Sequence, residues 1–287
     1  MKLYTFPVAP NPTKVRLYLA EKAAAGTTIP VGHEHDHHEP SAGVTNTKLG
    51  MWVFLATEVL FFGGLFAAYT IYRYKFERVF EQASNILDPM LGAINTIVLI
   101  FSSVTMAFAV RSAQQGKSKA IVGWLAATIL FGCLFLGIKV FMEWKHDAHL
   151  HVFPTADFNW TYAREMHSGG DHGHGHDSHG PEMKGIMFNS PVVPQKYIDA
   201  DARNPEAKQA RLFFFLYFTM TSLHAAHMVI GFGIMAVIMV YAWYGYYTPN
   251  YYVPVESVGL YWHFVDLVWI FLFPLLYLLG AHLGAGH

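Results

Sequence analysis

The chain has 287 residues, of which 53% are hydrophobic, 16% aromatic and only 14% charged. Soluble domains carry about 25% charged residues, so this composition indicates a membrane protein. The formal net charge is -1 and the 19 basic residues form no stripe, so we expect no nucleic-acid partner. The single cysteine, Cys133, lies in an apolar run and can supply neither a disulfide framework nor a cysteine-based metal cluster.

The N-terminal segment, residues 1–47, contains no apolar run long enough to cross a bilayer, and it includes the histidine-rich tract HEHDHH at residues 33–38. Its short strand-like and helix-like runs are too brief to make a domain. We predict a cytoplasmic arm that lies on the membrane or on a partner.

Five apolar runs in residues 48–287 are long enough to cross a bilayer as helices, where each backbone amide must find its partner within the helix. The sequence therefore predicts an all-α fold, an integral membrane bundle of five transmembrane helices. The predicted spans are Leu49 to Tyr72, Leu91 to Val110, Ala120 to Trp144, Leu212 to Trp243 and Ser257 to Leu283.

The connections between these spans differ in length. Residues 73–90 and 111–119 resemble ordinary loops between antiparallel neighbours. Residues 145–211 form a much longer connection with several prolines and the low-complexity tract HSGGDHGHGHDSHG. We expect a partly disordered, extracytoplasmic loop there rather than a second folded domain.

Basic residues near the spans predict the orientation, because short cytoplasmic loops retain positive charge. The side that carries the N-terminal arm and the second loop holds eight basic residues, against three on the side of the first loop. The eight are Lys2, Lys14, Arg16, Lys22, Lys48, Arg111, Lys117 and Lys119, and the three are Arg73, Lys75 and Arg78. The N-terminus is therefore predicted in the cytoplasm, and the long loop and the C-terminus outside.

Several ionisable side chains lie inside the predicted spans, where each costs about 2.5–3.5 kcal/mol on insertion scales unless it faces protein or water. His224 and His227 share one helix face at a spacing of three residues, and so do His263 and Asp266. Imidazole and carboxyl groups can satisfy one another by hydrogen bonds, so we predict an intramembrane polar belt with a structural or proton-related role. Its members are Glu58, His224, His227, His263, Asp266 and Glu143, with Lys139 one turn before Glu143.

Two other interpretations of these residues remain open. The hydrogen bonds can be purely structural, with no chemistry attached. Alternatively His224 and His227 can be part of a metal site, although two ligands on one helix do not fill one. The flexible His/Asp tracts can also bind zinc, copper or nickel loosely, without the fixed geometry of a dedicated site.

Four of the spans contain the segments LGMWVFLATEVLFFGGLFAAY, NTIVLIFSSVTMAFAV, TSLHAAHMVIG and VESVGLYWHFVDLVWIFLFPLLYL, and Glu143-Trp144 stands at the end of the third span. Together these segments resemble subunit III of haem-copper oxidases. The resemblance covers most of the chain outside the arm and the long loop, and YWHFVDLVWIFLFP is its most specific part. The long loop and the arm depart from the family pattern.

This resemblance implies a five-helix bacterial subunit that binds no haem or copper of its own, since those groups belong to partner subunits. It implies packing beside the catalytic subunit I, bound phospholipid, and support of proton uptake and turnover lifetime. By similarity, Glu58 matches the family's membrane-embedded glutamate, and His224, His227, His263 and Asp266 match its interhelical polar residues. We expect no catalytic, cofactor-binding or metal-binding residue on this chain.

The hypothesis is thus a non-catalytic subunit III of a proton-pumping terminal oxidase, either a cytochrome c oxidase or a quinol oxidase, in the bacterial cytoplasmic membrane. The expected partners are oxidase subunits I and II and phospholipids, with a larger respiratory supercomplex left open. An accessory subunit of a nitric-oxide reductase is the nearest alternative. A membrane metalloenzyme and a metal-ion transporter fed by the His tracts are alternatives of another class.

Overall fold

The computed structural model describes residues 42–155, 157–167, 183–184, 192–249 and 251–278. The chain divides into two compact units, Met1–Gly43 and Val44–His287, and almost every described residue belongs to the second. Most of the predicted arm, the HEHDHH tract and nearly all of the long low-complexity tract lie outside the described residues. The last residues of the predicted arm are already helical, because the first described helix begins at Ala42.

Five helices within the described residues are long and apolar enough to cross a membrane, which confirms the all-α membrane bundle. They are α2 (Ala42–Lys75), α4 (Pro89–Gln114), α5 (Ser118–Gly137), α9 (Pro205–Trp243) and α10 (Val253–Tyr277). Beyond α5 the third span continues through a π-helical turn, η1 (Ile138–Trp144), into α6 (Lys145–His149).

Two of these helices begin where the sequence places a capping residue directly before a proline. Asp88 accepts hydrogen bonds from the backbone N–H groups of Met90 and Leu91, and Asn204 accepts one from Glu206. Proline suits the first helical position, where its missing N–H would be unpaired anyway. Helix α9 therefore begins two turns before Leu212, the start of the apolar run predicted as the fourth span. At 39 residues, α9 is ~58 Å long and extends well beyond a bilayer core.

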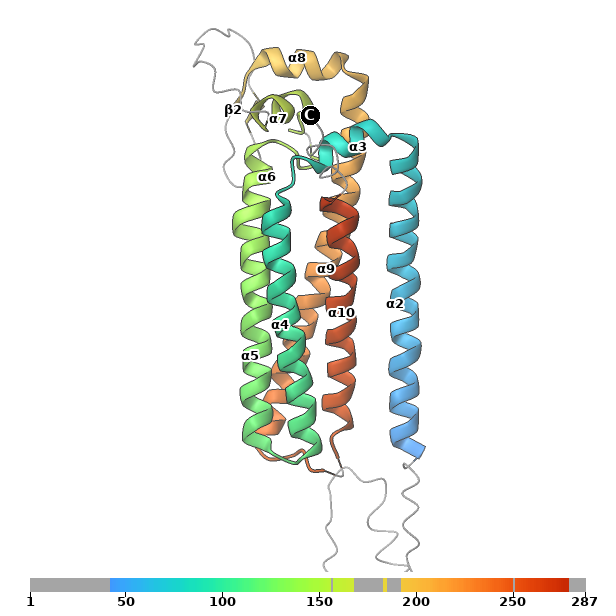
Figure 1. Cartoon of the computed structure of the whole chain (residues 1–287), viewed down its shortest axis with the longest axis vertical. Coiled ribbons are helices and arrows are strands. Elements are labelled where there is room, and N and C mark those ends of the chain that lie inside the picture. Colours follow the sequence, from blue (N-terminus) through green and yellow to red (C-terminus); the bar gives the residue numbers. More distant parts are fainter. Residues whose placement is uncertain (1–41, 156, 168–182, 185–191, 250, 279–287) are drawn as a thin grey trace, which may run out of the picture. The chain divides into compact units, whose positions relative to one another are not determined.

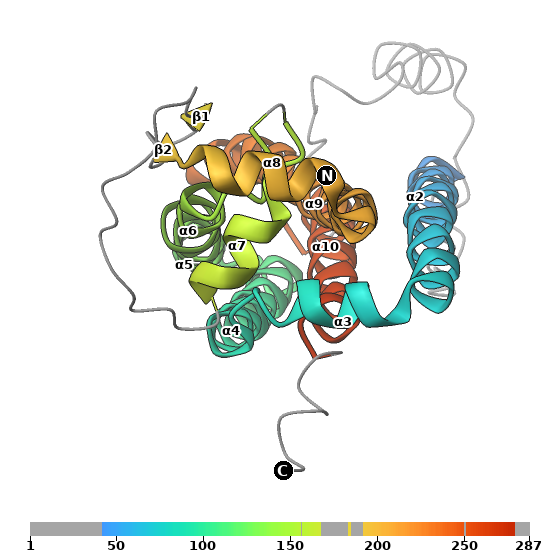
Figure 2. The same ribbon diagram turned by 90° about the horizontal axis from the view of Figure 1, so that it is seen from above.

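Helices α4, α5, α9 and α10 form a ring in which each packs against its two neighbours (Figures 1 and 2). Trp262 of α10 fills the middle of this ring and is fully buried. A Cβ atom on Gly231 would lie 2.9 Å from the Trp262 ring, and one on Gly132 would lie 2.5 Å from Phe232. Glycine at these two positions thus lets bulky rings of neighbouring helices reach the backbone.

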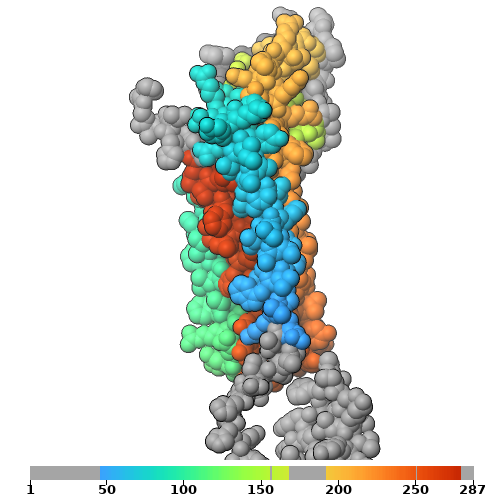
Figure 3. All heavy atoms as spheres, turned by 90° about the vertical axis from the view of Figure 1, so that its right-hand side faces the viewer, coloured from blue at the N-terminus to red at the C-terminus, as the bar shows by residue number. Residues whose placement is uncertain are grey.

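Helix α2 contacts the ring mainly through aromatic side chains. It is the least buried of the five spans, whereas α10 is the most buried. Ring centroids lie 6.1 Å apart for Phe54 and Tyr261 and 6.3 Å apart for Phe62 and Phe264. Figure 3 shows α2, in blue, running along the face made by α9 and α10. Its outward residues, including Leu60 and Tyr74, are exposed.

Shorter elements cover one end of the bundle (Figure 1). They are α3 (Glu77–Ser84), α6, α7 (Trp160–His167), α8 (Gln195–Arg203) and the short strands β1 (Met183–Lys184) and β2 (Val192–Val193), which pair antiparallel. The connection predicted at 73–90 contains the short helix α3. The described parts of 145–211 contain short helices that form a cap on the bundle, and the predicted disorder of that connection stays a prediction.

The cap is held by buried aromatic packing and by polar contacts between its helices. Tyr162 and Tyr197 pack edge to face at 5.3 Å, together with Val193. Asp201 accepts hydrogen bonds from the Thr161 N–H at 3.0 Å and from its hydroxyl at 3.1 Å. Burial raises the pKa of the Asp201 carboxyl above its ordinary value, and the two Thr161 hydrogen bonds oppose that shift.

Candidate functional site

The predicted polar belt separates into several clusters at different places in the bundle. Glu58 and His227 form one pair. His263 and Asp266 of α10 lie near Ser103 of α4, and His224 packs between aromatic rings in the core. Glu143 belongs to a network at the end of the bundle that carries the cap. On an α-helix, the side chains of residues i and i+3 differ in direction by about 60° around the helix axis. This angle is enough for the two side chains to meet different neighbouring helices.

Glu58 of α2 and His227 of α9 form the most informative pair. Glu58 Oε2 lies 3.2 Å from His227 Nε2, and both side chains are partly exposed, at 19% and 16%. His227 Nδ1 lies 2.8 Å from the Leu223 carbonyl oxygen. A carbonyl oxygen only accepts, so Nδ1 must carry a hydrogen and donate it.

This tautomer of His227 determines how many protons the Glu58–His227 contact holds. A neutral imidazole with its hydrogen on Nδ1 presents a bare lone pair at Nε2, which would repel a carboxylate. The 3.2 Å contact therefore requires one further proton, held either by Glu58 as a neutral acid or by His227 as an imidazolium. The pair is a one-proton site inside a membrane span, tied also to α10 by the Tyr261 hydroxyl, which donates to the His227 carbonyl at 2.9 Å.

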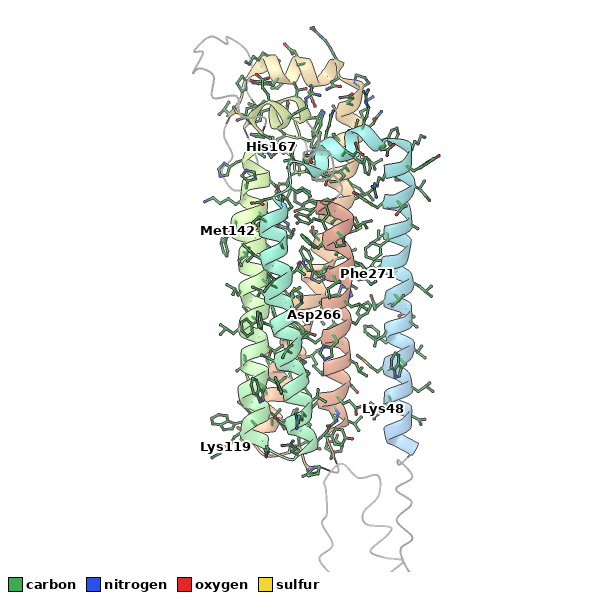
Figure 4. All side chains as sticks on the ribbon, in the orientation of Figure 1. Lys48, Lys119, Met142, His167, Asp266 and Phe271 are labelled. Carbon is green, nitrogen blue, oxygen red and sulfur yellow. The ribbon has the colours of Figure 1, made fainter. Side chains whose placement is uncertain are left out.

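His263 and Asp266 do not bond to each other, so the predicted mutual hydrogen bond is wrong for this pair. His263 Nδ1 lies 2.7 Å from the Ser103 hydroxyl of α4. Asp266 is buried in the interior of the bundle (Figure 4). Neither of its carboxyl oxygens has a well-aligned hydrogen bond among the described residues, although Ser103 lies close enough to interact with it.

His224 is buried between aromatic rings rather than paired with His227. Its ring centroid lies 5.7 Å from that of Phe135 and 5.3 Å from that of Trp269. Its Nε2 atom has no hydrogen-bond partner among the described residues. Although the two histidines are only three residues apart, His224 faces the core and His227 faces α2.

Glu143 lies in a buried network with Lys139, Tyr217 and Tyr277. Lys139 Nζ donates to Glu143 Oε1 at 2.6 Å, to the Tyr217 hydroxyl at 3.0 Å and to the Tyr277 hydroxyl. Both tyrosine hydroxyls donate to Glu143 Oε1, Tyr217 at 2.5 Å. Lys139 also sits over the rings of Tyr217, Trp269 and Tyr277 at 4.9–5.1 Å.

The π-helical turn η1 carries both charged members of this network. Such turns are rare and frequently occur at functional sites. Sequence reasoning identified Lys139 and Glu143 by their spacing, but it missed Tyr217 and Tyr277, which come from α9 and α10. A tyrosine in a long apolar run can lie at the membrane interface or can donate a hydrogen bond inside the bundle, and the sequence does not distinguish the two positions.

No group of three or more His, Cys, Asp or Glu side chains converges as a metal site within the part of the chain that the structure describes. The metalloenzyme alternative would use His224, His227, His263, Asp266 and Glu58 as ligands. Of these five described residues, only Glu58 and His227 are within hydrogen-bond distance of each other. The geometry therefore gives that alternative no assembled ligand set.

Comparison with known proteins gives the family. Relatives include cytochrome bo(3) ubiquinol oxidase subunit 3 of Pseudomonas aeruginosa, 25% identical over 88% of this chain and 92% of that protein. The Pseudomonas putida protein of the same name is 26% identical over 82% of this chain and 86% of its own length. A probable quinol oxidase subunit 3 of Staphylococcus aureus (strain USA300) is 24% identical over 81% and 89%.

The family model described as cytochrome c oxidase subunit III matches residues 30–157 and 207–281, which is well over half of the chain and includes all or most of each of the five spans. The unmatched internal stretch, 158–206, contains α7, the two short strands and α8. This part of the cap thus departs from the family pattern. The chain belongs to the cytochrome c oxidase subunit III family, the subunit III of haem-copper oxidases.

Proposed function

We propose that the chain is a non-catalytic subunit of a proton-pumping terminal oxidase, in which it stabilises subunit I, holds phospholipid and supports proton uptake. Haem and copper are bound by the partner subunits I and II, and this chain supplies no redox ligand. Family membership supports the subunit role. The observation that carries the proton-related role is the Glu58–His227 contact, in which a proton must lie between the carboxyl group and the imidazole inside the membrane.

The position of the pair supports this role. Glu58 lies ~18 Å along α2 from Asn46, close to the middle of the membrane span. Both side chains are partly exposed, at 19% for Glu58 and 16% for His227, so neither is sealed in the core of the bundle. An intramembrane acid next to an imidazole is the arrangement expected for a group that accepts and releases protons.

The exposed apolar residues of α2 and α9 support a lipid-facing role for this side of the protein. Phe61 of α2 and Ile230 of α9 lie near the level of the pair and are about half exposed, at 50% and 55%. Phospholipid acyl chains match such surfaces in polarity. Phospholipid bound here would limit the access of water to Glu58.

Purification of the complex through an affinity tag on this chain tests the subunit role. We expect co-purification of subunits I and II, a haem spectrum, and oxygen consumption with either a quinol or reduced cytochrome c, whichever is the donor. A complex that reduces nitric oxide and consumes no oxygen would overturn the oxidase assignment. A tagged chain that purifies alone with a stoichiometric metal ion would favour the metalloenzyme alternative.

We propose that the N-terminus lies in the cytoplasm and the cap outside. Lys48 and Lys119 lie at one end of the bundle and His167 at the other (Figure 4), in agreement with the excess of basic residues near the first end. In a Cys133→Ser background, we expect Arg203→Cys to react with a membrane-impermeant thiol reagent in intact cells and Lys117→Cys to react only after lysis. The reverse pattern would invert the orientation.

A further inference from the structure

Asp147 stands next to the Lys139–Glu143 network as a second buried carboxyl group. Lys139, Glu143 and Asp147 are only 1%, 3% and 1% exposed. One lysine and two carboxyl groups cannot balance their charges if all three are ionised. The cluster would then hold an uncompensated negative charge in a place where water does not reach it.

The hydrogen bonds show which carboxyl group is left over. Lys139 Nζ and the hydroxyls of Tyr217 and Tyr277 all donate to Glu143 Oε1, and Lys139 also donates to both hydroxyls, which makes a neutral ion pair with three donors on one carboxyl oxygen. Glu143 Oε2 has no hydrogen-bond partner among the described residues. Among the described residues, the one side-chain donor to Asp147 is the Tyr217 hydroxyl, at 3.4 Å, and the proton of that hydroxyl already goes to Glu143 at 2.5 Å. Within the described part of the chain, no lysine or arginine forms an ion pair with Asp147.

The nearest titratable group on the accessible side is His146. Its side chain is 57% exposed, and its Nδ1 lies 4.0 Å from Asp147 Oδ1. This distance is too long for a direct hydrogen bond, but one bridging water molecule or a small ring rotation spans it. His146 is also acted on by His149, His167, Asp88 and Glu143. From the interior, Asp147 is faced by Lys139, Glu143, Tyr217 and Tyr277.

We propose that Asp147 is a proton-binding site at the cap end of the bundle: the cluster holds one proton in excess of its Lys139–Glu143 ion pair, and His146 exchanges that proton with the surrounding water. The ligand is a proton, and the site is separate from the Glu58–His227 pair, which joins α2 to α9. The inference stands on the geometry of this chain and does not require the proposed role in proton uptake.

Infrared spectroscopy of the intact purified complex tests the site, because a protonated carboxyl group and a carboxylate absorb at different frequencies. At neutral pH, Asp147→Asn should remove one carboxylic-acid C=O band, and it should leave assembly intact because an amide replaces a neutral acid in shape and charge. An unchanged band pattern would mean that Asp147 is ionised, which would overturn the proposal. If Asp147→Asn does not assemble, Asp147→Glu should shift the band, and no shift would overturn it.

The exchange route has its own test. After transfer into D2O, the Asp147 band of His146→Gln should shift severalfold more slowly than that of the unaltered complex, while the band itself remains. His149→Gln is the matched control, since His149 lies on the same short helix and makes no ion pair with Asp147 among the described residues. Equal exchange in His146→Gln and the unaltered complex, or equal slowing in both variants, would contradict the assignment of His146 as the exchanging group.

Discussion

Replacing Lys139 by methionine is expected to destabilise the protein strongly. The substitution leaves Glu143 as a buried carboxylate without its cation. Removing one partner of a buried ion pair lowers the free energy of unfolding by about 3–5 kcal/mol. It also removes the donor to the Tyr217 and Tyr277 hydroxyls and the cation above three aromatic rings. Thermal unfolding of the detergent-solubilised complex, followed by loss of assembled subunit, measures the effect.

Two further variants separate loss of charge balance from loss of packing. Lys139→Met with Glu143→Leu removes both charges and should recover most of the stability, because apolar residues of similar volume replace buried ion pairs at little cost. Lys145→Met changes an exposed lysine on the next turn and should have little effect. A double variant as unstable as the single one would show that Lys139 acts through packing alone.

The five spans could be predicted because a bilayer imposes a simple length and polarity requirement on each helix. Their ends could not be placed from hydropathy, because α9 continues as a helix beyond its apolar run. The pair Asn204-Pro205 is a start signal that hydropathy ignores. The low-complexity tract obscured the neighbouring helices α7 and α8, whose periodic patterns are short.

The identities of the buried polar residues could also be predicted, since an ionisable side chain inside a span must face protein or water. Their pairing could not, because it depends on how the helices are rotated and which neighbour each face meets. Glu58 thus pairs with His227 on α9, while His263 turns to Ser103 on α4. The hydroxyls of Tyr217 and Tyr277 complete the Lys139 cluster, although these two tyrosines are 60 positions apart in the sequence.

Replacing Glu58 by glutamine is expected to change function with little effect on folding. A glutamine side chain can donate its amide N–H to the bare Nε2 lone pair of His227, so the contact between α2 and α9 is kept. The exchangeable proton of the pair is lost. We therefore expect normal assembly, a stability change of about 1 kcal/mol or less, and faster loss of activity during turnover.

Glu256→Gln is the matched control for this variant. Glu256 also ties α2 to the bundle, through Lys48 at 3.0 Å, but at the exposed end of the helices rather than within the membrane. Surface ion pairs contribute about 0–1 kcal/mol, so this control removes a similar link without removing an intramembrane proton site.

The activity of the assembled complex over many turnovers tests the proton-related role of the chain most directly. We expect that Glu58→Gln starts near the unaltered rate and then inactivates severalfold faster, whereas Glu256→Gln follows the unaltered time course. Identical time courses for all three complexes would contradict it, and would leave the Glu58–His227 pair as a structural link between two helices.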